Sequence, residues 1–215
     1  MKYVADSVQN PFGLDLPCRS GVPGFGNPNA HFHIIGDHPG IHGGVESNIP
    51  FTEMPWSTQF FETLAASGLL NSADIADITE KSRTFFSYIH PCLPNPSDKE
   101  PSPTQYADMV PFFDAELRAV TAHVLFPVGE RATEHVLRTC TSEVAETIDM
   151  ETLHAKEIRG SGWLVIPIRE PSEWTDADRK ALEKALSDLL ARDYRQISDL
   201  TRFLGGAKPY SYTTR

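Results

Sequence analysis

A glycine-rich turn holds the residue best placed to do chemistry. Asp37 stands in the run Gly36-Asp37-His38-Pro39-Gly40, and two further glycines follow at Gly43 and Gly44. A carboxylate in such a turn could orient and partly deprotonate a water molecule, while the glycines let the backbone approach a ligand closely. The alternative is that Asp37 caps a turn through its own backbone, and the motif alone leaves both interpretations open.

Phe51, which directly follows Pro50 at the end of the same loop, is a candidate for binding a flat ligand. An aromatic ring at that place could stack on a planar base. Packing in the hydrophobic core is the usual role of a single Phe, so this residue also keeps two interpretations.

A metal site is a further possibility, because His38 and His42 lie in the turn and His90 and Cys92 lie further along the chain. Zinc takes a compact tetrahedral set of nitrogen and sulfur ligands at recognisable spacings, and these four residues match none of them. We therefore expect no metal, and a metal-dependent hydrolase is the least favoured alternative.

The surrounding sequence predicts the elements that must position these residues. Strands are expected at 31–35, 83–89, 123–128 and 163–168, and helices at about 55–69, 104–119, 130–139 and 175–194. Strands that alternate with helices predict an α/β fold of three layers (αβα), with a mostly parallel four-stranded sheet and helices on both faces. Ligands of such sheets bind at the carboxyl ends of the strands, so loops 36–51, 90–103 and 169–174 should meet at the site.

Length and composition predict a single domain over residues 1–215, with an irregular lead-in over 1–29 that is rich in Pro, Gly and Asn. No apolar run is long enough for a membrane span, and the first ten residues lack the apolar segment of a signal peptide. The three cysteines Cys18, Cys92 and Cys140 are far apart and form no CxxC pair, which predicts three reduced thiols. We expect a cytoplasmic monomer.

Seven segments follow one another along the chain: Asn10-Pro11-Phe12-Gly13 with Cys18, Val22-Pro23-Gly24-Phe25-Gly26, the Asp37 turn, Pro50-Phe51, the stretch 88–94, Leu125-Phe126-Pro127-Val128-Gly129-Glu130-Arg131-Ala132, and Arg169-Glu170-Pro171-Ser172. In this order and spacing they resemble the uracil-DNA glycosylase superfamily, in particular its archaeal and thermophilic members, over about residues 10–204. The resemblance implies a DNA-base N-glycosylase of base-excision repair. Such an enzyme flips a damaged or deaminated base out of DNA and hydrolyses its N-glycosidic bond.

The resemblance also implies a role for each matching residue. Asp37 takes the place of the family's Glu, which positions the attacking water, and Glu170 takes the place of the His that stabilises charge on the departing base. The implied binding residues are Gly36, His38, Pro39 and Gly40 in the turn that holds the base, Phe51 stacked on it, Tyr88 (or Ser87) at its edge, and Ser172 at a DNA phosphate.

Two of these positions depart from the family. An imidazole can donate a hydrogen bond to a base anion, whereas an ionised Glu170 repels it and could help only if a dry pocket raised its pKa. Tyr88 stands where the family has a base-reading Asn, which allows a substrate other than uracil.

The family often holds a four-iron cluster on four cysteines, and this chain departs from that pattern too. Only Cys18 and Cys92 fall near the ligand positions, Met109 takes the fourth, and Cys140 lies elsewhere. Because such a cluster needs thiolate ligands, we expect no iron–sulfur cluster and no other cofactor.

The formal net charge of −10 counts against a large basic surface for DNA. Together with the replacements at Tyr88 and Glu170, this charge favours an alternative function. That alternative is a non-catalytic nucleotide or nucleic-acid binding module on the same fold.

Overall fold

The computed structural model describes residues 8–79, 81–95, 98, 100–141 and 148–195. Within these residues one six-stranded sheet runs in the order β1-β3-β2-β4-β6-β5, with its four inner strands parallel and the two edge strands antiparallel to their neighbours. The strands are β1 (Phe25–Gly26), β2 (Phe32–Gly36), β3 (Thr84–Tyr88), β4 (Val124–Pro127), β5 (Ile158–Arg159) and β6 (Leu164–Val165).

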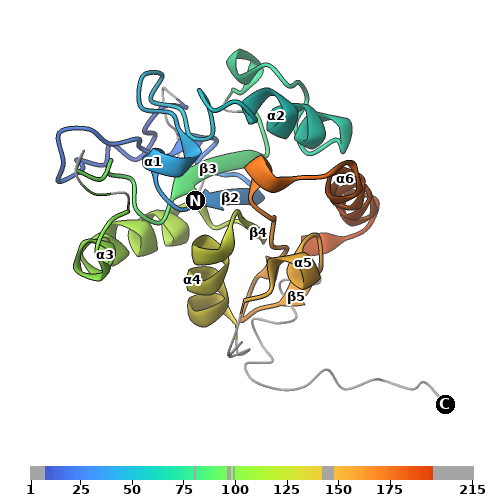
Figure 1. The fold of residues 1–215 in the computed structure, drawn as a ribbon. Coiled ribbons are helices and arrows are strands. Elements are labelled where there is room, and N and C mark those ends of the chain that lie inside the picture. The colour runs from blue at the N-terminus through green and yellow to red at the C-terminus, as the bar shows by residue number, and fades with distance from the viewer. Residues whose placement is uncertain (1–7, 80, 96–97, 99, 142–147, 196–215) are drawn as a thin grey trace.

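Helices cover both faces of this sheet, as Figure 1 shows. On one face lie α2 (Ser57–Ala66) and α6 (Asp176–Leu190), and on the other lie α3 (Pro103–Val120) and α4 (Glu130–Cys140). Shorter elements are α1 (Pro39–His42), α5 (Met150–Leu153) and the 3₁₀ turns η1 (Ile75–Asp77) and η2 (Pro171–Glu173). The predicted three-layer α/β fold is therefore confirmed.

Strand β2 shows why two separate cores form. Phe32 and Ile34 point into the α2/α6 layer, while Ile35 points into the α3/α4 layer, as the alternation of a strand requires. All three side chains are fully buried, and each such burial contributes about 1.5–3 kcal/mol to stability. A strand that is buried on both faces must occupy the middle of the sheet, where its carboxyl end opens into the loops.

Three details of the predicted elements are corrected by the structure. The sheet has six strands rather than four, because β1 and β5 are two-residue edge strands too short to show an alternating pattern. The region 36–51 is not entirely loop, since the short helix α1 starts directly after β2. Helix α6 ends at Leu190 and not near residue 194.

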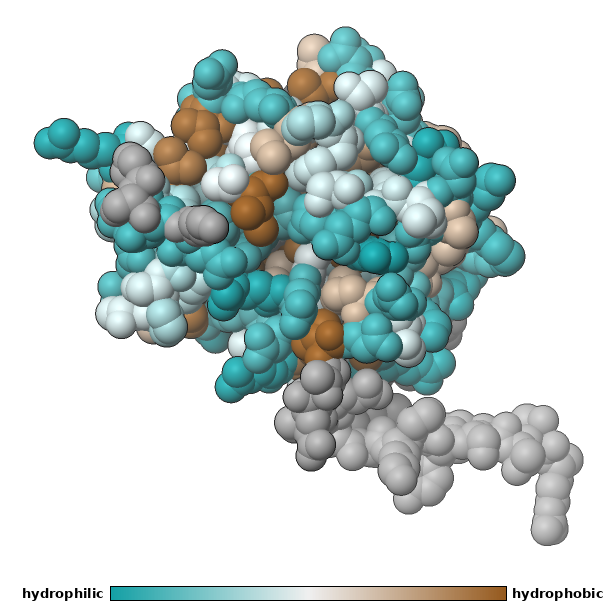
Figure 2. Space-filling view, in the orientation of Figure 1, coloured by the Kyte–Doolittle hydropathy of each residue, from teal (hydrophilic) through white to brown (hydrophobic). Residues whose placement is uncertain are grey.

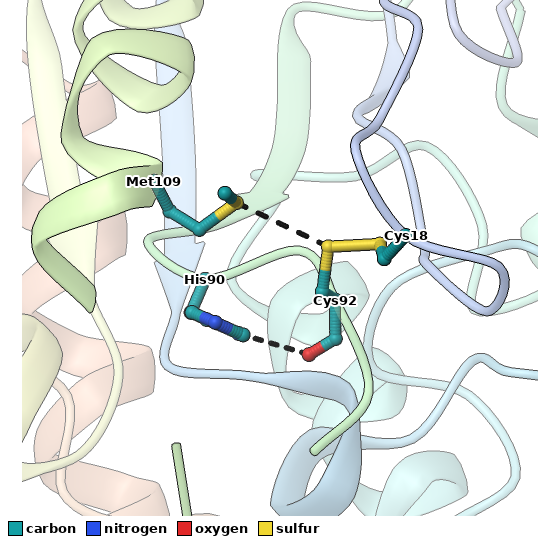
Figure 3. The surroundings of a disulfide bond; sticks show 4 residues. All are labelled: Cys18, His90, Cys92 and Met109. Carbon is teal, nitrogen blue, oxygen red and sulfur yellow. Dashed lines mark hydrogen bonds between the residues drawn. A yellow bond between two sulfur atoms is a disulfide. The ribbon is translucent and has the colours of Figure 1, made fainter. Parts of the chain in front are cut away.

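The N-terminal segment lies beside the loop after β3 and is covalently attached to it (Figure 3). The amide of Val22 donates to the carbonyl of Pro91, Gly21 forms an antiparallel bridge with Cys92, and Cys18 is disulfide-bonded to Cys92. The prediction of three reduced thiols is wrong for this pair, and Cys140 is the buried free cysteine. The sequence hid the pairing because 74 residues separate the two sulfurs along the chain.

Over the described residues, no helix combines the length and apolar character needed to cross a membrane. The face in Figure 2 is mainly hydrophilic, with hydrophobic groups in small separate areas. The large hydrophobic side chains that the described residues leave exposed are Ile41, in helix α1, and Leu93, in the loop after β3. That the entire chain forms one domain stays a prediction.

Candidate active site

Parallel pairing of β2 with β3 places the Asp37 turn beside Tyr88. Gly36 is paired with Tyr88 in the sheet, and the amide of His90 then donates to the carbonyl of Asp37. A side chain on Gly36 would place its Cβ within 2.8 Å of Phe51 and Tyr88 and within 2.7 Å of His42. Glycine is therefore required where the strand ends, because three rings crowd that point.

The carboxylate of Asp37 is held by side chains from two helices. Its Oδ1 accepts a hydrogen bond of 2.5 Å from the hydroxyl of Tyr106 on α3, and its Oδ2 lies 3.5 Å from Nε of Arg131 on α4. The guanidinium of Arg131 also lies over the Tyr106 ring, 4.7 Å from its centroid. The side chain that caps the turn is His38 instead, so the carboxylate of Asp37 is available for another role.

Burial dominates the electrostatics of Asp37, which is 6% exposed. Desolvation raises the pKa of its carboxyl group, and Tyr106, His42 and Arg131 oppose that rise in part. The same burial and the neighbouring carboxylate raise the pKa of the Tyr106 hydroxyl, so this group stays a donor. Asp37 therefore combines limited contact with solvent with two fixed partners, which suits a group that orients one water molecule.

His38 is fully buried beside Asp37. Its Nδ1 accepts from the amide of Gly40, so the ring proton of the neutral form is on Nε2. Burial lowers the pKa of His38 to about 4, which keeps the ring neutral at pH 7. Among the described residues Nε2 has no hydrogen-bond partner. This leaves a buried N–H donor on the residue that follows Asp37.

Tyr88 and Phe51 form the aromatic side of the site. The Tyr88 hydroxyl accepts from the amide of Phe51 at 2.7 Å and lies 3.0 Å from the carbonyl of His42, to which it can donate. Phe51 is fully buried, has a left-handed backbone (φ 67°) and stacks on Phe60 with ring centroids 5.1 Å apart. Core packing on Phe60 accounts for one face of the Phe51 ring. Whether the ring could also stack on a planar base depends on what lies at its other face.

The imidazole of His42 joins the remaining parts of the site. Its Nδ1 accepts from the amide of Asp37 at 3.0 Å, and its Nε2 lies 3.0 Å from Oε2 of Glu170. Its ring centroid lies 5.2 Å from that of Phe51 and 6.0 Å from that of Tyr88. The Asp37 turn and the segment that carries Glu170 thus meet at one place, but the space between them is filled by His42 rather than open.

The remaining predicted binding residues lie at the edge of this cluster. Pro39 is buried at the first position of α1, and Gly40 is exposed beside it. Ser172 is exposed in the 3₁₀ turn Pro171–Glu173, two residues after Glu170. Glu170 itself lies against Gly129, where an added Cβ would be 2.9 Å from Oε2.

Sequence reasoning missed Tyr106 and Arg131, and it considered His42 only as a metal ligand. Tyr106 looked like one more residue of a helix, and Arg131 lay in a segment noted only for its family resemblance. Their approach to Asp37 depends on how α3 and α4 pack on the sheet, which the sequence pattern does not report.

The residues near the family's cluster positions do not fit an iron–sulfur cluster. No group of three or more His, Cys, Asp or Glu side chains with metal-binding geometry occurs in the part of the chain that the structure describes. The sulfurs of Cys18 and Cys92 are bonded to each other, and the third nearby sulfur is the thioether of Met109, 4.0 Å from Cys92 (Figure 3). A four-thiolate cluster cannot use this set, because a disulfide provides no thiolate.

Comparison with known proteins gives a consistent picture. Residues 23–190 match the family model of the uracil DNA glycosylase superfamily. The type-4 uracil-DNA glycosylase of Saccharolobus solfataricus is 22% identical over 186 residues, which cover 84% of this chain and 76% of that protein. The type-5 uracil-DNA glycosylases of Mycobacterium bovis and Mycobacterium tuberculosis are 29% identical over 106 residues, which cover 48% of this chain and 39% of theirs.

Proposed function

Because the chain belongs to the uracil-DNA glycosylase superfamily, we propose that it is a DNA-base N-glycosylase in which the replacements at Tyr88 and Glu170 allow a base other than uracil. Its relatives support a glycosylase acting on DNA in general. In the proposed reaction, a base flipped out of DNA is released when a water molecule hydrolyses its N-glycosidic bond.

One observation carries this proposal: the Asp37 carboxylate is fixed by Tyr106 and Arg131 at the carboxyl end of β2. This is the edge at which parallel sheets bind their ligands. A carboxylate with one oxygen on a hydroxyl and the other near a guanidinium can orient a water and accept part of its proton. The unpaired Nε2–H of His38 supports the proposal, because a buried donor is best satisfied by a ligand or by water.

Glu170 and Phe51 complete the proposed site. Through His42, Glu170 is two hydrogen bonds from the amide of Asp37, so in the proposed reaction its carboxyl group would lie beside a base held by the Asp37 turn. Phe51 would stack on the base with the ring face that now lies toward His42. Gly36, His38, Pro39 and Gly40 would hold it from the turn, Tyr88 would contact its edge, and Ser172 would contact a phosphate.

A base-release assay with an Asp37→Asn variant tests the proposal. We expect wild-type protein to release at least one base from oligonucleotides that contain uracil, hypoxanthine or oxidised bases, at low or high salt. Asp37→Asn should slow that release by about 10²–10⁴-fold, since an amide cannot take a proton from water. Asp188→Asn makes the same change at an exposed residue of α6 and should leave the rate unchanged. Intact oligonucleotides throughout the panel would refute the function.

The filled site favours a second candidate, a non-catalytic module that binds a nucleotide or nucleic acid. His42, Phe51 and Tyr88 are each no more than 1% exposed, so a base has no ready access to them. This candidate predicts DNA or nucleotide binding without base release, with an affinity that Asp37→Asn does not change. Phe51→Ala is a poor test, because Phe51 also packs on Phe60 in the core.

A further inference from the structure

The imidazole of His42 lies in a slot with aromatic walls. Its ring is nearly parallel to that of Tyr88 (24°) and inclined by 36° to that of Phe51, while Trp56 meets it edge-on at 5.9 Å. The side chain is 0% exposed. Phe51 and Tyr88 also contact each other, with ring centroids 5.4 Å apart, so the imidazole packs against one aromatic wall that both rings form. A planar nucleobase can stack on such a wall.

The edges of this slot supply one donor and one acceptor. Nδ1 of His42 accepts from the amide of Asp37, so it carries no proton in this arrangement, and the ring proton lies on Nε2 and is donated to Glu170. The slot thus accommodates a planar nitrogen heterocycle that has an acceptor on one edge and an N–H on another. Pyrimidines with carbonyl and N–H groups belong to this chemical class.

The route by which His42 could leave the slot is also defined. The carbonyls of His42 and Gly43 lie 3.0 and 3.1 Å from the hydroxyl of Tyr88, which holds the backbone in place. Glu170 is 24% exposed, so its edge of the slot is the one nearest solvent. Rotation of the His42 side chain past Glu170 would open the slot without moving the strand.

We propose that the His42 imidazole occupies the position of the target base, so that a base enters only by displacing His42. The inference rests on the proposed function, because it assigns where in that site the base binds. It makes His42 a specificity-determining residue: a base must compete with an imidazole that is already stacked and hydrogen-bonded. The inference also explains why the site is closed although Tyr106 and Arg131 still hold Asp37 in place.

The slot can be tested without any DNA reaction. His42→Gly and His42→Ala remove the ring, and circular dichroism shows whether each variant is folded. We expect free uracil or imidazole to raise the melting temperature of a folded variant by about 2–4 °C at saturation, and to leave wild-type protein unchanged. His33→Gly is the matched control, because His33 is equally buried but lies between Phe85 and Phe113 in the opposite layer.

The inference is overturned if neither folded His42 variant responds to uracil or imidazole, or if His33→Gly responds equally to uracil. If both His42 variants fail to fold, the NMR chemical shifts of the His42 ring in wild-type protein provide the test. These shifts should move to the values of a solvent-exposed histidine when the protein is saturated with an abasic-site oligonucleotide plus free uracil. Unchanged shifts overturn the inference.

An activity measurement separates this inference from the proposed function. With any base that wild-type protein releases, His42→Ala should lower KM by about tenfold, because the base no longer competes with the ring. Loss of release in His42→Ala would instead make His42 a participant in the chemistry and overturn its role as an occupant. If no base is released by either protein, the proposed function fails, while uracil binding by His42→Gly still decides whether the slot exists.

Discussion

At the scale of single residues, the candidate chemistry depends on how two carboxylates are partnered. Asp37 is held by a hydroxyl and a guanidinium, whereas Glu170 is paired with the imidazole of His42. The first arrangement keeps a carboxylate in place for a water molecule. The arrangement at Glu170 places a carboxylate where the family resemblance implies an imidazole. Each of the two carboxylates therefore leads to a separate prediction.

Tyr106→Phe should shift the acidic limb of the pH–rate profile to higher pH. The Tyr106 hydroxyl lowers the pKa of Asp37, which burial has raised, so removing that donor raises the pKa further. Only the ionised carboxylate can accept a proton, and activity is lost as the pH falls through the pKa. We expect Tyr106→Phe to lower the rate most strongly at acidic pH and less at pH 8. An unchanged limb would show that Tyr106 does not act on Asp37.

Glu170→His should raise the rate of uracil release by at least about tenfold. An imidazole can donate a hydrogen bond to the departing base, and one such donor typically contributes about 10²–10³ in rate. Glu170→Gln separates charge from hydrogen bonding, since it removes the negative charge with little change in shape. A gain in both variants would assign the effect to charge alone, and no gain in either would contradict the proposed place of residue 170.

At the scale of elements, the contact between β3 and α3 contains a buried polar row away from the active site. Nε2 of His33 lies 2.8 Å from the hydroxyl of Ser87, which also hydrogen-bonds Glu116 on α3. Burial raises the pKa of Glu116 to about 7 and lowers that of His33 to about 3. Near pH 7 this helix therefore packs on the sheet through a carboxyl group that is close to losing its proton.

Glu116 should make stability fall as the pH rises. Its pKa is higher in the folded protein than the ordinary 4.5, so its contribution is fully present below pH 4.5 and is lost as the pH rises through about 7. Relative to Glu116→Gln, wild-type protein should lose on the order of 3 kcal/mol over that range. Urea unfolding at a series of pH values measures the difference. Glu62→Gln, at an exposed residue of α2, should show no such trend.

At the scale of the whole molecule, one covalent link determines how the N-terminal segment is attached. The disulfide between Cys18 and Cys92 connects that segment to the loop after β3, close to the carboxyl ends of the strands. A hollow of about 380 Å³ lies beside it, lined in part by His90, Asp108 and Met109. The N-terminal lead-in therefore helps to line the hollow near the candidate site, and it is not only a segment that precedes the fold.

Cys18→Ser should lower the free energy of unfolding by about 2–4 kcal/mol under oxidising conditions. The link closes a loop of 74 residues, and cross-linking a loop of that length restricts the unfolded chain. In reducing buffer the variant and wild-type protein should unfold alike. Cys140→Ala serves as a comparison, because its effect should not depend on the reductant. An equal difference in both buffers would mean that Cys18 contributes by packing alone.

The sequence by itself determined the layers of this protein and the loops that hold its candidate site. Runs of strand-forming and helix-forming residues alternate, and parallel strands bring their carboxyl ends to one edge, so the loops that hold Asp37 and Glu170 were predicted to meet. The roles of Asp37, Tyr88 and Glu170 came from the family resemblance. The edge strands β1 and β5 and the short helical elements α1, α5, η1 and η2 were missed, because segments of two to four residues show no periodicity.

Only the tertiary structure decided what fills that site and what holds its parts. The ring of His42 lies in the site because of the rotamer that its side chain adopts. Tyr106 and Arg131 reach Asp37 because their helices pack on the sheet. Cys18 reaches Cys92 across 74 residues. Each of these contacts joins residues that are far apart along the chain or depends on the rotamer of a side chain. A local sequence pattern predicts neither. Local patterns specify elements, whereas contacts between elements depend on where the folded chain returns.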